Sequence, residues 1–452
     1  MTPKNRTTQI PYRRKSPSSI KQLYVKDLFG RYTYSLPEKP IPRTDFSRFF
    51  ILYGENGSGK TTILRLLFCT LSPVPGGGYK TAIARTPFSR FTITFNDGTT
   101  VNISRKQGQL LGPFDLKIVK NRKIIDKYSF AVNSDNAVRI GENPDLNDFV
   151  RRLSNLEIDL YMLPDNRRIL GSTLEDHEDD DVRDWIGLSA SARNLLTAGR
   201  FGRGKERPSA VEETSKRLLE WVKQQALQGS TIGEANANEI YLNILNTLVE
   251  PKPEVKGYER ARPISPEYLL RLGRQSEPYS NYGFTSEFPA KQLASFLKGA
   301  RERSNATQRR TVQQVLRPYV QSVKARLDAS ENLVSLLTEF LNTLESFFAD
   351  KHVLFTLQEG LKIEAEKNKL IPLDNLSSGE KQLLLMLCNI ILARQRVSIF
   401  IIDEPEISLN VAWQRRLLRA FNDLTRGANI QFVLATHSLE ILSSYRKFVV
   451  KL

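Results

Sequence analysis

The feature that most constrains this chain is the glycine-rich octapeptide GENGSGKT, which runs from Gly54 to Thr61. The five residues before it, FFILY, are apolar enough for a short buried strand, and the residues after it space their apolar side chains as a helix does. Small residues let the backbone N–H groups of such a turn point inwards around an anion. The sequence therefore predicts a phosphate-binding loop between a strand and a helix.

The loop also indicates which nucleotide groups it holds. Lys60 is long enough to reach β- and γ-phosphates, and the hydroxyl of Thr61 is a suitable ligand for Mg²⁺. We therefore predict ATP and Mg²⁺ as cofactors. The expected nucleotide-binding residues of this segment are Gly54, Asn56, Gly57, Ser58, Gly59, Lys60, Thr61 and Thr62.

A second informative segment is SIFIIDEPE, in which four apolar residues precede Asp403 and Glu404. Asp403 is expected to support the metal ion through its outer shell, together with Thr61. Glu404 is expected to polarise a water molecule for attack on the γ-phosphate. The alternative is an ordinary strand end that carries two acids.

A third segment, NLSSGEKQ, places small residues at a turn before a helix, which is a typical anion site. Its candidate residues are Ser377, Ser378 and Gly379. A chain that already has a phosphate loop at Lys60 gains little from a second one on the same nucleotide. The pair of sites therefore indicates a dimer in which ATP lies between the subunits.

These segments, with a histidine near the end, resemble the motifs of ABC-type ATPases. Gly54–Thr61 resembles Walker A, Leu376–Glu380 the signature, Phe400–Glu404 Walker B, and His437 the switch histidine. LSSGEKQ departs from the LSGGQ of transporters and is more similar to the SMC, RecF and OLD-type branch, which acts on DNA. That branch interrupts its ATP head between Walker A and the signature, and the same arrangement is expected here.

The resemblance implies a role for each matching residue. Ser377 and Gly379 would touch the γ-phosphate held by the other subunit, and Glu404, His437 and Lys60 would be the catalytic residues. Among the weaker matches, Tyr32 or Tyr34 is a candidate for stacking a ring on adenine, with core packing as the alternative. Asn410, in ISLN, stands in the segment after Walker B, and Gln107 or Gln109 is a candidate for the Q-loop glutamine by position only. Arg167 or Arg168 is a candidate for a nucleotide or partner contact, with a surface loop as the alternative.

The predicted fold class is α/β, a P-loop ABC-type ATPase head with a strand-rich first lobe, a parallel sheet core and a mainly helical insertion. Residues 90–105 and 114–130 read as hairpins, residues 312–348 as one long amphipathic helix or two, and 352–373 as two or three strands. We expect a flexible basic arm (1–18), the first part of the head (19–181), a basic helical insertion (182–349) and the second part of the head (350–452).

Charge points to a polyanionic partner. The chain has a net charge of +17, and residues 183–330 hold 24 Lys and Arg against 15 Asp and Glu. The densest runs are Arg200–Arg207 and Arg301–Arg310, which could contact DNA phosphates or an acidic DNA-mimic protein. The alternative is a generally basic surface without a polyanionic partner. We interpret the acidic run Glu175–Asp181 as a solvated loop.

Composition narrows the cellular setting. There are two cysteines, Cys69 and Cys388, which we interpret as buried apolar residues, so no disulfide framework is expected. No apolar run reaches the roughly 18 residues that a membrane span needs, and the basic N-terminus lacks the apolar core of a secretory signal. A cytoplasmic protein without a membrane partner is predicted.

OLD-type nucleases continue into a Toprim nuclease domain, and we expect no room for one after His437. The sequence has three histidines, so we do not expect an HNH nuclease site. A nuclease would then be a separate chain, a layout similar to the ATPase components of bacterial antiphage systems such as PARIS and Septu. We therefore expect an ATPase that controls a partner effector in antiphage defence. The alternatives are a DNA repair or segregation ATPase, a non-hydrolysing ATP-dependent scaffold, and a transporter subunit.

Overall fold

The structure is a computed structural model in which the chain forms two compact units, Met1–Arg207 with Ile390–Leu452, and Pro208–Asn389. It describes residues 19–37, 48–73, 78–138, 145–154, 158–163, 170–171, 209–249, 263–303, 306–348, 350–365, 369–394, 398–443, 445 and 448–452. The predicted arm 1–18, Arg167, Arg168, the acidic run 175–181 and the basic run 200–207 lie outside the described residues. The expected four-part division stays a prediction, and the compact units divide the chain at other points.

An antiparallel sheet forms one layer of the first unit. Its strand order is β2-β1-β4-β5-β6-β7. Their bounds are β1 (Ile20–Leu28), β2 (Tyr32–Leu36), β4 (Arg90–Phe95), β5 (Thr99–Ser104), β6 (Phe114–Lys120) and β7 (Lys123–Phe130). The two predicted hairpins are confirmed as β4–β5 and β6–β7. Asn121 and Arg122 both have positive φ, which gives the turn between β6 and β7 the twist that a two-residue hairpin requires.

A second sheet of the first unit is mainly parallel, with the order β15-β3-β14-β13-β8-β9. Its strands are β3 (Phe49–Tyr53), β8 (Asp159–Leu163), β9 (Leu170–Gly171), β13 (Ser398–Asp403), β14 (Ile430–Thr436) and β15 (Val449–Lys451). All neighbours are parallel except β8 and β9. Every residue of β14 is buried, as expected for a central strand covered on both faces.

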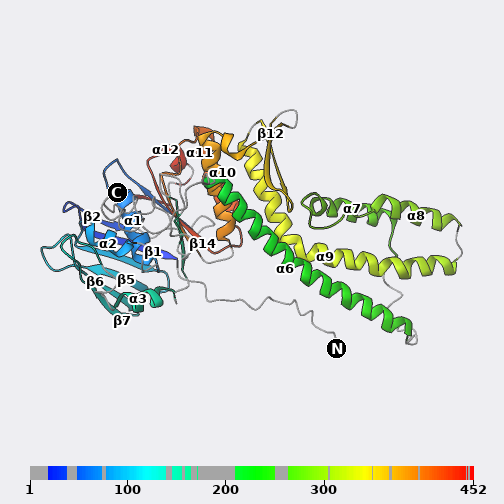
Figure 1. The fold of residues 1–452 in the computed structure, drawn as a ribbon, viewed down its shortest axis with the longest axis horizontal. Helices are drawn as coiled ribbons and strands as arrows, with labels where there is room; N and C mark the ends of the chain where they lie inside the picture. Colours follow the sequence, from blue (N-terminus) through cyan, green and yellow to red (C-terminus); the bar gives the residue numbers. More distant parts are fainter. Residues whose placement is uncertain are drawn as a thin grey trace, which may run out of the picture. The chain divides into compact units, whose positions relative to one another are not determined.

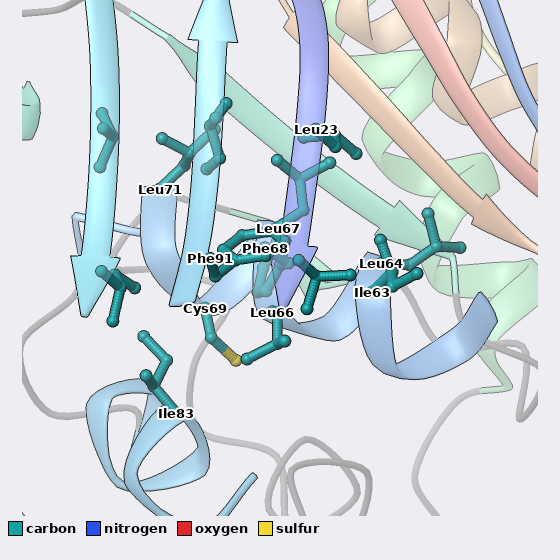
Figure 2. Packing of buried hydrophobic residues seen from close by; sticks show 14 of the residues in the cluster. Leu23, Ile63, Leu64, Leu66, Leu67, Phe68, Cys69, Leu71, Ile83 and Phe91 are labelled. Carbon is teal, nitrogen blue, oxygen red and sulfur yellow. The ribbon is translucent and has the colours of Figure 1, made fainter. Parts of the chain in front are cut away.

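The helix α1 (Lys60–Leu71) packs between the two sheets and joins them into one core. Figure 2 shows its side chains gathered with Leu23 of β1, Phe91 of β4 and Ile83 of α2 (Tyr79–Arg85). The unit also contains α3 (Asp145–Ser154), α11 (Val411–Leu424) and α12 (Leu439–Ser443). Both cysteines are buried free thiols, which confirms their interpretation as apolar residues.

The second unit is mostly helical. Its long helices α6 (Ala210–Val249) and α9 (Ala306–Phe347) lie side by side (Figure 1). Residues 312–348 therefore belong mainly to one continuous helix rather than two. The unit also holds α7 (Pro266–Asn281), α8 (Ala290–Arg303), the short helix η5 (Leu373–Asn375) and an antiparallel sheet of β10 (Lys351–Thr356), β11 (Gly360–Ala365) and β12 (Lys369–Ile371). The helix α10 (Ser378–Ala393) begins in this unit and ends in the first.

The predicted α/β class, with its strand-rich first lobe, parallel sheet and mainly helical insertion, is confirmed. Within the described part of the chain, no helix combines the length and the apolar character that crossing a membrane would require.

Candidate functional site

Three of the predicted segments meet at one edge of the parallel sheet. The central strand β14 pairs with β3 on one side and with β13 on the other, with Thr436 opposite Tyr53 and Ala435 opposite Asp403. Neighbouring strands lie about 4.8 Å apart. The glycine-rich loop after β3, the acids after β13 and His437 after β14 are therefore adjacent, at the carboxyl edge where open parallel sheets bind ligands.

The glycine-rich loop is packed on one side and open on the other. A Cβ on Gly59 would lie 2.7 Å from Cδ2 of Leu28, and a Cβ on Gly54 would lie 2.7 Å from Oγ of Ser58. A Cβ on Gly57 would meet nothing within 4 Å, although φ of +81° favours glycine there. The loop thus presents bare backbone on its open side, which is the surface that a phosphate needs.

Lys60 is buried within this loop, with 5% of its surface exposed. Its Nζ donates hydrogen bonds to the carbonyl oxygens of Gly54 at 2.8 Å and Glu55 at 3.0 Å. An ammonium has three donors, so one remains for a further acceptor. Oγ of Ser58 is also buried and has no hydrogen-bond partner among the described residues. Two polar groups of the loop therefore suit an anion.

The acids after β13 include one buried carboxylate and one that solvent reaches. Asp403 is 2% exposed, whereas the side chain of Glu404 is 26% exposed. Glu404 has a φ of +49°, and its N–H donates to the carbonyl of Ala435 at 2.9 Å. Its Oε1 lies 3.4 Å from Nδ1 of His437, whose side chain is 46% exposed. The structure therefore brings these two predicted catalytic residues together.

Glu406 is a site residue that the sequence reasoning missed. It is 6% exposed, and its Oε1 accepts hydrogen bonds from the Thr436 hydroxyl and from the N–H groups of His437 and Ser438. The available signal was the third acid in DEPE, two residues beyond Glu404.

The tyrosines considered for adenine are packed rather than open. Their rings stack with centroids 5.7 Å apart, and both lie against the core of the first unit. Tyr34 also donates its hydroxyl to the carbonyl of Ser58 at 3.1 Å, and burial raises its pKa. Phe29, in the turn after β1, is 46% exposed, and its Cε2 lies 3.5 Å from where a Cβ of Gly59 would be. It is the more accessible ring beside the loop.

The signature segment lies in the second unit, whereas the strand ends lie in the first. Ser377 and Ser378 are exposed, and Gly379 is buried. Ser377 and Glu380 form a capping box, in which Oε2 of Glu380 accepts from the N–H and hydroxyl of Ser377 at 2.8 Å each. Lys351 of β10 pairs with the other oxygen of Glu380.

The remaining candidates have structural surroundings of their own. Asn410 is the N-cap of α11, where its Oδ1 accepts from the N–H of Trp413 at 2.9 Å. Gln107 and Gln109 are exposed in the turn after β5. Of the run 301–310, the structure describes the side chains of Gln308 and Arg309, and both are exposed.

The residues present fit a nucleotide phosphate with Mg²⁺. The open backbone at Gly57, the buried hydroxyl of Ser58 and the remaining donor of Lys60 suit the anion. Among the described residues, no group of three or more His, Cys, Asp or Glu side chains is placed to hold a metal by itself. Mg²⁺ in phosphate sites keeps several waters and takes few protein ligands, so Thr61 and Asp403 suffice as its candidates.

A family model described as "AAA domain, putative AbiEii toxin, Type IV TA system" matches residues 263–443. No curated protein matches the chain. Among solved structures, the chain is similar to a Smc head domain with an extended coiled coil bound to the C-terminal domain of ScpA, from Pyrococcus furiosus, at 13% identity and a TM-score of 0.37. It is also similar to an SmcHead bound to the C-winged helix domain of ScpA, at 11% identity and a TM-score of 0.37. Each alignment covers 94% of this chain and 91% of the other. Over residues 263–443, less than half of its length, the chain is thus similar to the AAA-domain family.

Proposed function

We propose that this protein is a Mg²⁺-dependent ATPase that binds ATP at the glycine-rich loop and hydrolyses it between subunits. The observation that carries the proposal is the meeting of three strand ends, which sets the loop of Lys60 beside Glu404 and His437. The family match supports it, since residues 263–443 include the acids and the histidine.

We assign each residue of the site a role in ATP binding or hydrolysis. The backbone of Gly54–Thr62 and the ammonium of Lys60 bind the phosphates, and Thr61 and Asp403 hold Mg²⁺. Bound Mg²⁺ neutralises charge that develops on the phosphate oxygens. Glu404 orients and polarises the attacking water, and His437 senses the γ-phosphate, a role supported by its Nδ1 lying 3.4 Å from Oε1 of Glu404. Ser377, Ser378 and Gly379 of a second copy complete the site, so the working form is a dimer or a higher oligomer.

The output of this cycle is control of a separate effector. A toxin–antitoxin description of the matching family supports a defence role, and we propose a nuclease as the effector in antiphage defence. The basic insertion is the proposed contact for DNA or for an acidic DNA-mimic protein.

The first prediction tests hydrolysis through Glu404→Gln. We expect phosphate release to fall by about 10²- to 10⁴-fold, because the base that polarises water is lost. ATP binding should persist, and an ATP-dependent oligomer should accumulate in mass measurements. Lys60→Ala should lose ATP binding, and Glu359→Gln, at an exposed turn of the second unit, should match the wild type.

The ATPase proposal would be overturned if the wild-type protein does not hydrolyse ATP and its oligomer mass is the same with and without nucleotide. That result would favour a scaffold. Salt-sensitive binding to DNA ends by the isolated protein, without any co-purifying chain, would instead favour a repair or segregation ATPase.

A further inference from the structure

Glu406 ties the end of β14 to the turn that follows β13. Its Oε1 accepts from Oγ1 of Thr436 at 2.6 Å and from the N–H groups of His437 at 3.0 Å and Ser438 at 3.2 Å. The pairing of β14 with β3 stops at Thr436, so these two N–H groups lie beyond the ladder. A buried carboxylate is stable only when donors replace its lost hydration. We call Thr436–Ser438 the switch segment.

Gln414 makes a second connection to the same segment. It lies in the first turn of α11, where its Oε1 accepts from the hydroxyl of Ser438 at 2.6 Å. Its Nε2 donates to the carbonyl oxygen of Leu409 at 2.9 Å. The amide therefore bridges the last part of the turn after β13 and the switch segment.

The turn itself has a closely determined backbone. Glu404 and Ser408 are non-glycine residues with φ of +49° and +67°. The N–H of Ile407 donates to the carbonyl of Glu404 at 3.1 Å, and the N–H of Leu409 donates to the carbonyl of Glu406 at 2.9 Å. Left-handed backbone at such residues persists only where the surroundings hold it. We call residues 404–410 the acidic turn.

The position of His437 depends on these connections. Its imidazole is 46% exposed, so packing alone does not hold the ring 3.4 Å from Glu404. Glu406 binds the backbone N–H of His437, and its Oε1 also lies 3.9 Å from Nδ1 of the ring. We infer that Glu406 and Gln414 form a clamp that joins the acidic turn and the switch segment into one unit and positions His437 against Glu404.

This inference rests on the proposed ATP hydrolysis and adds two residues that position its machinery. Glu406 and Gln414 act here as positioning residues, since they reach the reaction through His437.

A double-mutant cycle tests the clamp. Glu406→Ala should lower kcat by up to about 100-fold, because misplacing a reacting group by about 1 Å costs that much. KM for ATP should stay within about threefold, since the phosphate loop is untouched. Gln414→Ala should act in the same direction, and Glu406→Gln, which keeps one acceptor oxygen, should recover part of the rate.

In a His437→Ala background, Glu406→Ala should cause little further loss, because the clamp acts through that histidine. Equal losses in both backgrounds would overturn the inference. The matched control is Arg415→Ala, which removes an exposed ion pair with Glu440 between α11 and α12 and should leave kcat within about twofold.

Amide hydrogen exchange separates this inference from the proposed function. The amides of His437 and Ser438 should exchange at least about tenfold faster in Glu406→Ala than in the wild type or Arg415→Ala. Unchanged exchange would overturn the clamp even in an active ATPase. A protein that hydrolyses no ATP would refute the proposed function, while the exchange rates would still decide whether the clamp exists.

Discussion

Phe29 illustrates how one residue acquires a position that its sequence neighbours do not reveal. It has a φ of +56° in the turn between β1 and β2, and this conformation sets its ring beside Gly59 of the glycine-rich loop. Tyr34, five residues on, is anchored to Ser58 instead. An exposed aromatic ring at the rim of a phosphate loop is suited to stack on a base.

The second prediction therefore concerns Phe29→Ala. Base stacking is worth about 1–3 kcal/mol by alanine substitution, so ATP affinity should fall by roughly 5- to 150-fold. Equilibrium titration with ATP and with inorganic triphosphate checks this, since triphosphate has no base and should bind both proteins alike. An equal weakening of both ligands would mean that Phe29 supports the loop rather than the base. Ile124→Ala, at an exposed site of β7, is the control.

Lys80 is a residue whose charge is buried against a helix end. Its Nζ donates to the carbonyl oxygens of Cys69 at 2.6 Å, Thr70 at 3.1 Å and Ser72 at 3.3 Å, at the end of α1. It also lies 4.8 Å from the ring centroid of Phe149. Burial lowers the pKa of Lys80 to about 7. The lysine thus satisfies carbonyls that the helix leaves without partners.

The third prediction is that Lys80→Met destabilises the protein by about 1–3 kcal/mol at pH 7, because buried carbonyls lose their donor. Between about pH 7 and the ordinary pKa of 10.5, the unfolded chain holds a proton that the folded protein has released. The free energy of unfolding of the wild type should therefore rise with pH in this window. Denaturant unfolding at pH 7 and 9 should show that the free energy of unfolding of Lys80→Met falls further below that of the wild type as pH rises. A difference that stays the same at both pH values would contradict the argument. Lys106→Met, at an exposed position, is the control.

At the scale of elements, the start of α10 shows how the proposed signature segment also caps a helix. Glu380 caps the helix through Ser377 and pairs with Lys351. Burial would raise the pKa of Glu380, but hydrogen bonds from Lys351 and Ser377 and the charge of Lys351 outweigh it and hold the pKa below its usual value. Ser377 and Ser378 are both exposed, and the hydroxyl of Ser377 donates to Oε2 of Glu380 at 2.8 Å.

The fourth prediction concerns Glu380→Gln. The wild-type carboxylate contributes stability above its unfolded pKa of 4.5, and this contribution is lost as pH falls through the lower folded value. The variant should be less stable by about 1–2 kcal/mol at pH 7, with a smaller difference at pH 3.5. Urea unfolding at both values measures this, and a constant difference would speak against the ion pair. Glu359→Gln, in an exposed pair with Lys362, should change little.

At the scale of the whole molecule, two units with separate cores share one continuous helix. The first unit holds the core around α1, and the second holds a core of α7, α8 and α9. The helix α10 begins behind the signature residues of one unit and ends in the other.

The fifth prediction is that ATP with Mg²⁺ stabilises the chain through the first unit. At about 100 times its Kd, a ligand that binds only the folded state adds about 2.7 kcal/mol, and Tm should rise accordingly. Hydrogen exchange should slow in the first unit around Gly54–Lys60. Lys60→Ala should show neither effect. Stabilisation that persists in this variant would place the nucleotide elsewhere.

Local residue preferences allowed much of the fold and of the candidate site to be predicted from the sequence. The apolar runs before Gly54 and Asp403 are buried strands, since a strand covered on both faces needs an unbroken apolar sequence. Gly57 and Gly59 of the loop have positive φ, and Asn96-Asp97-Gly98 turns a hairpin as expected. These features depend on residues a few positions apart, which is the range over which backbone preferences act.

The amino-acid sequence by itself thus determined the α/β class, the glycine-rich loop, the apolar strand before Asp403 and Glu404, and the helical character of the middle of the chain. Only the tertiary structure decided which side chains meet there: Glu406 with the switch segment, Gln414 with Leu409 and Ser438, Phe29 with Gly59, and Lys80 with the end of α1. Several of these contacts join residues that lie about 30 positions apart along the chain, such as Glu406 with Thr436 and Phe29 with Gly59. Their partners are set by strand order and packing, and no local pattern of residues encodes those.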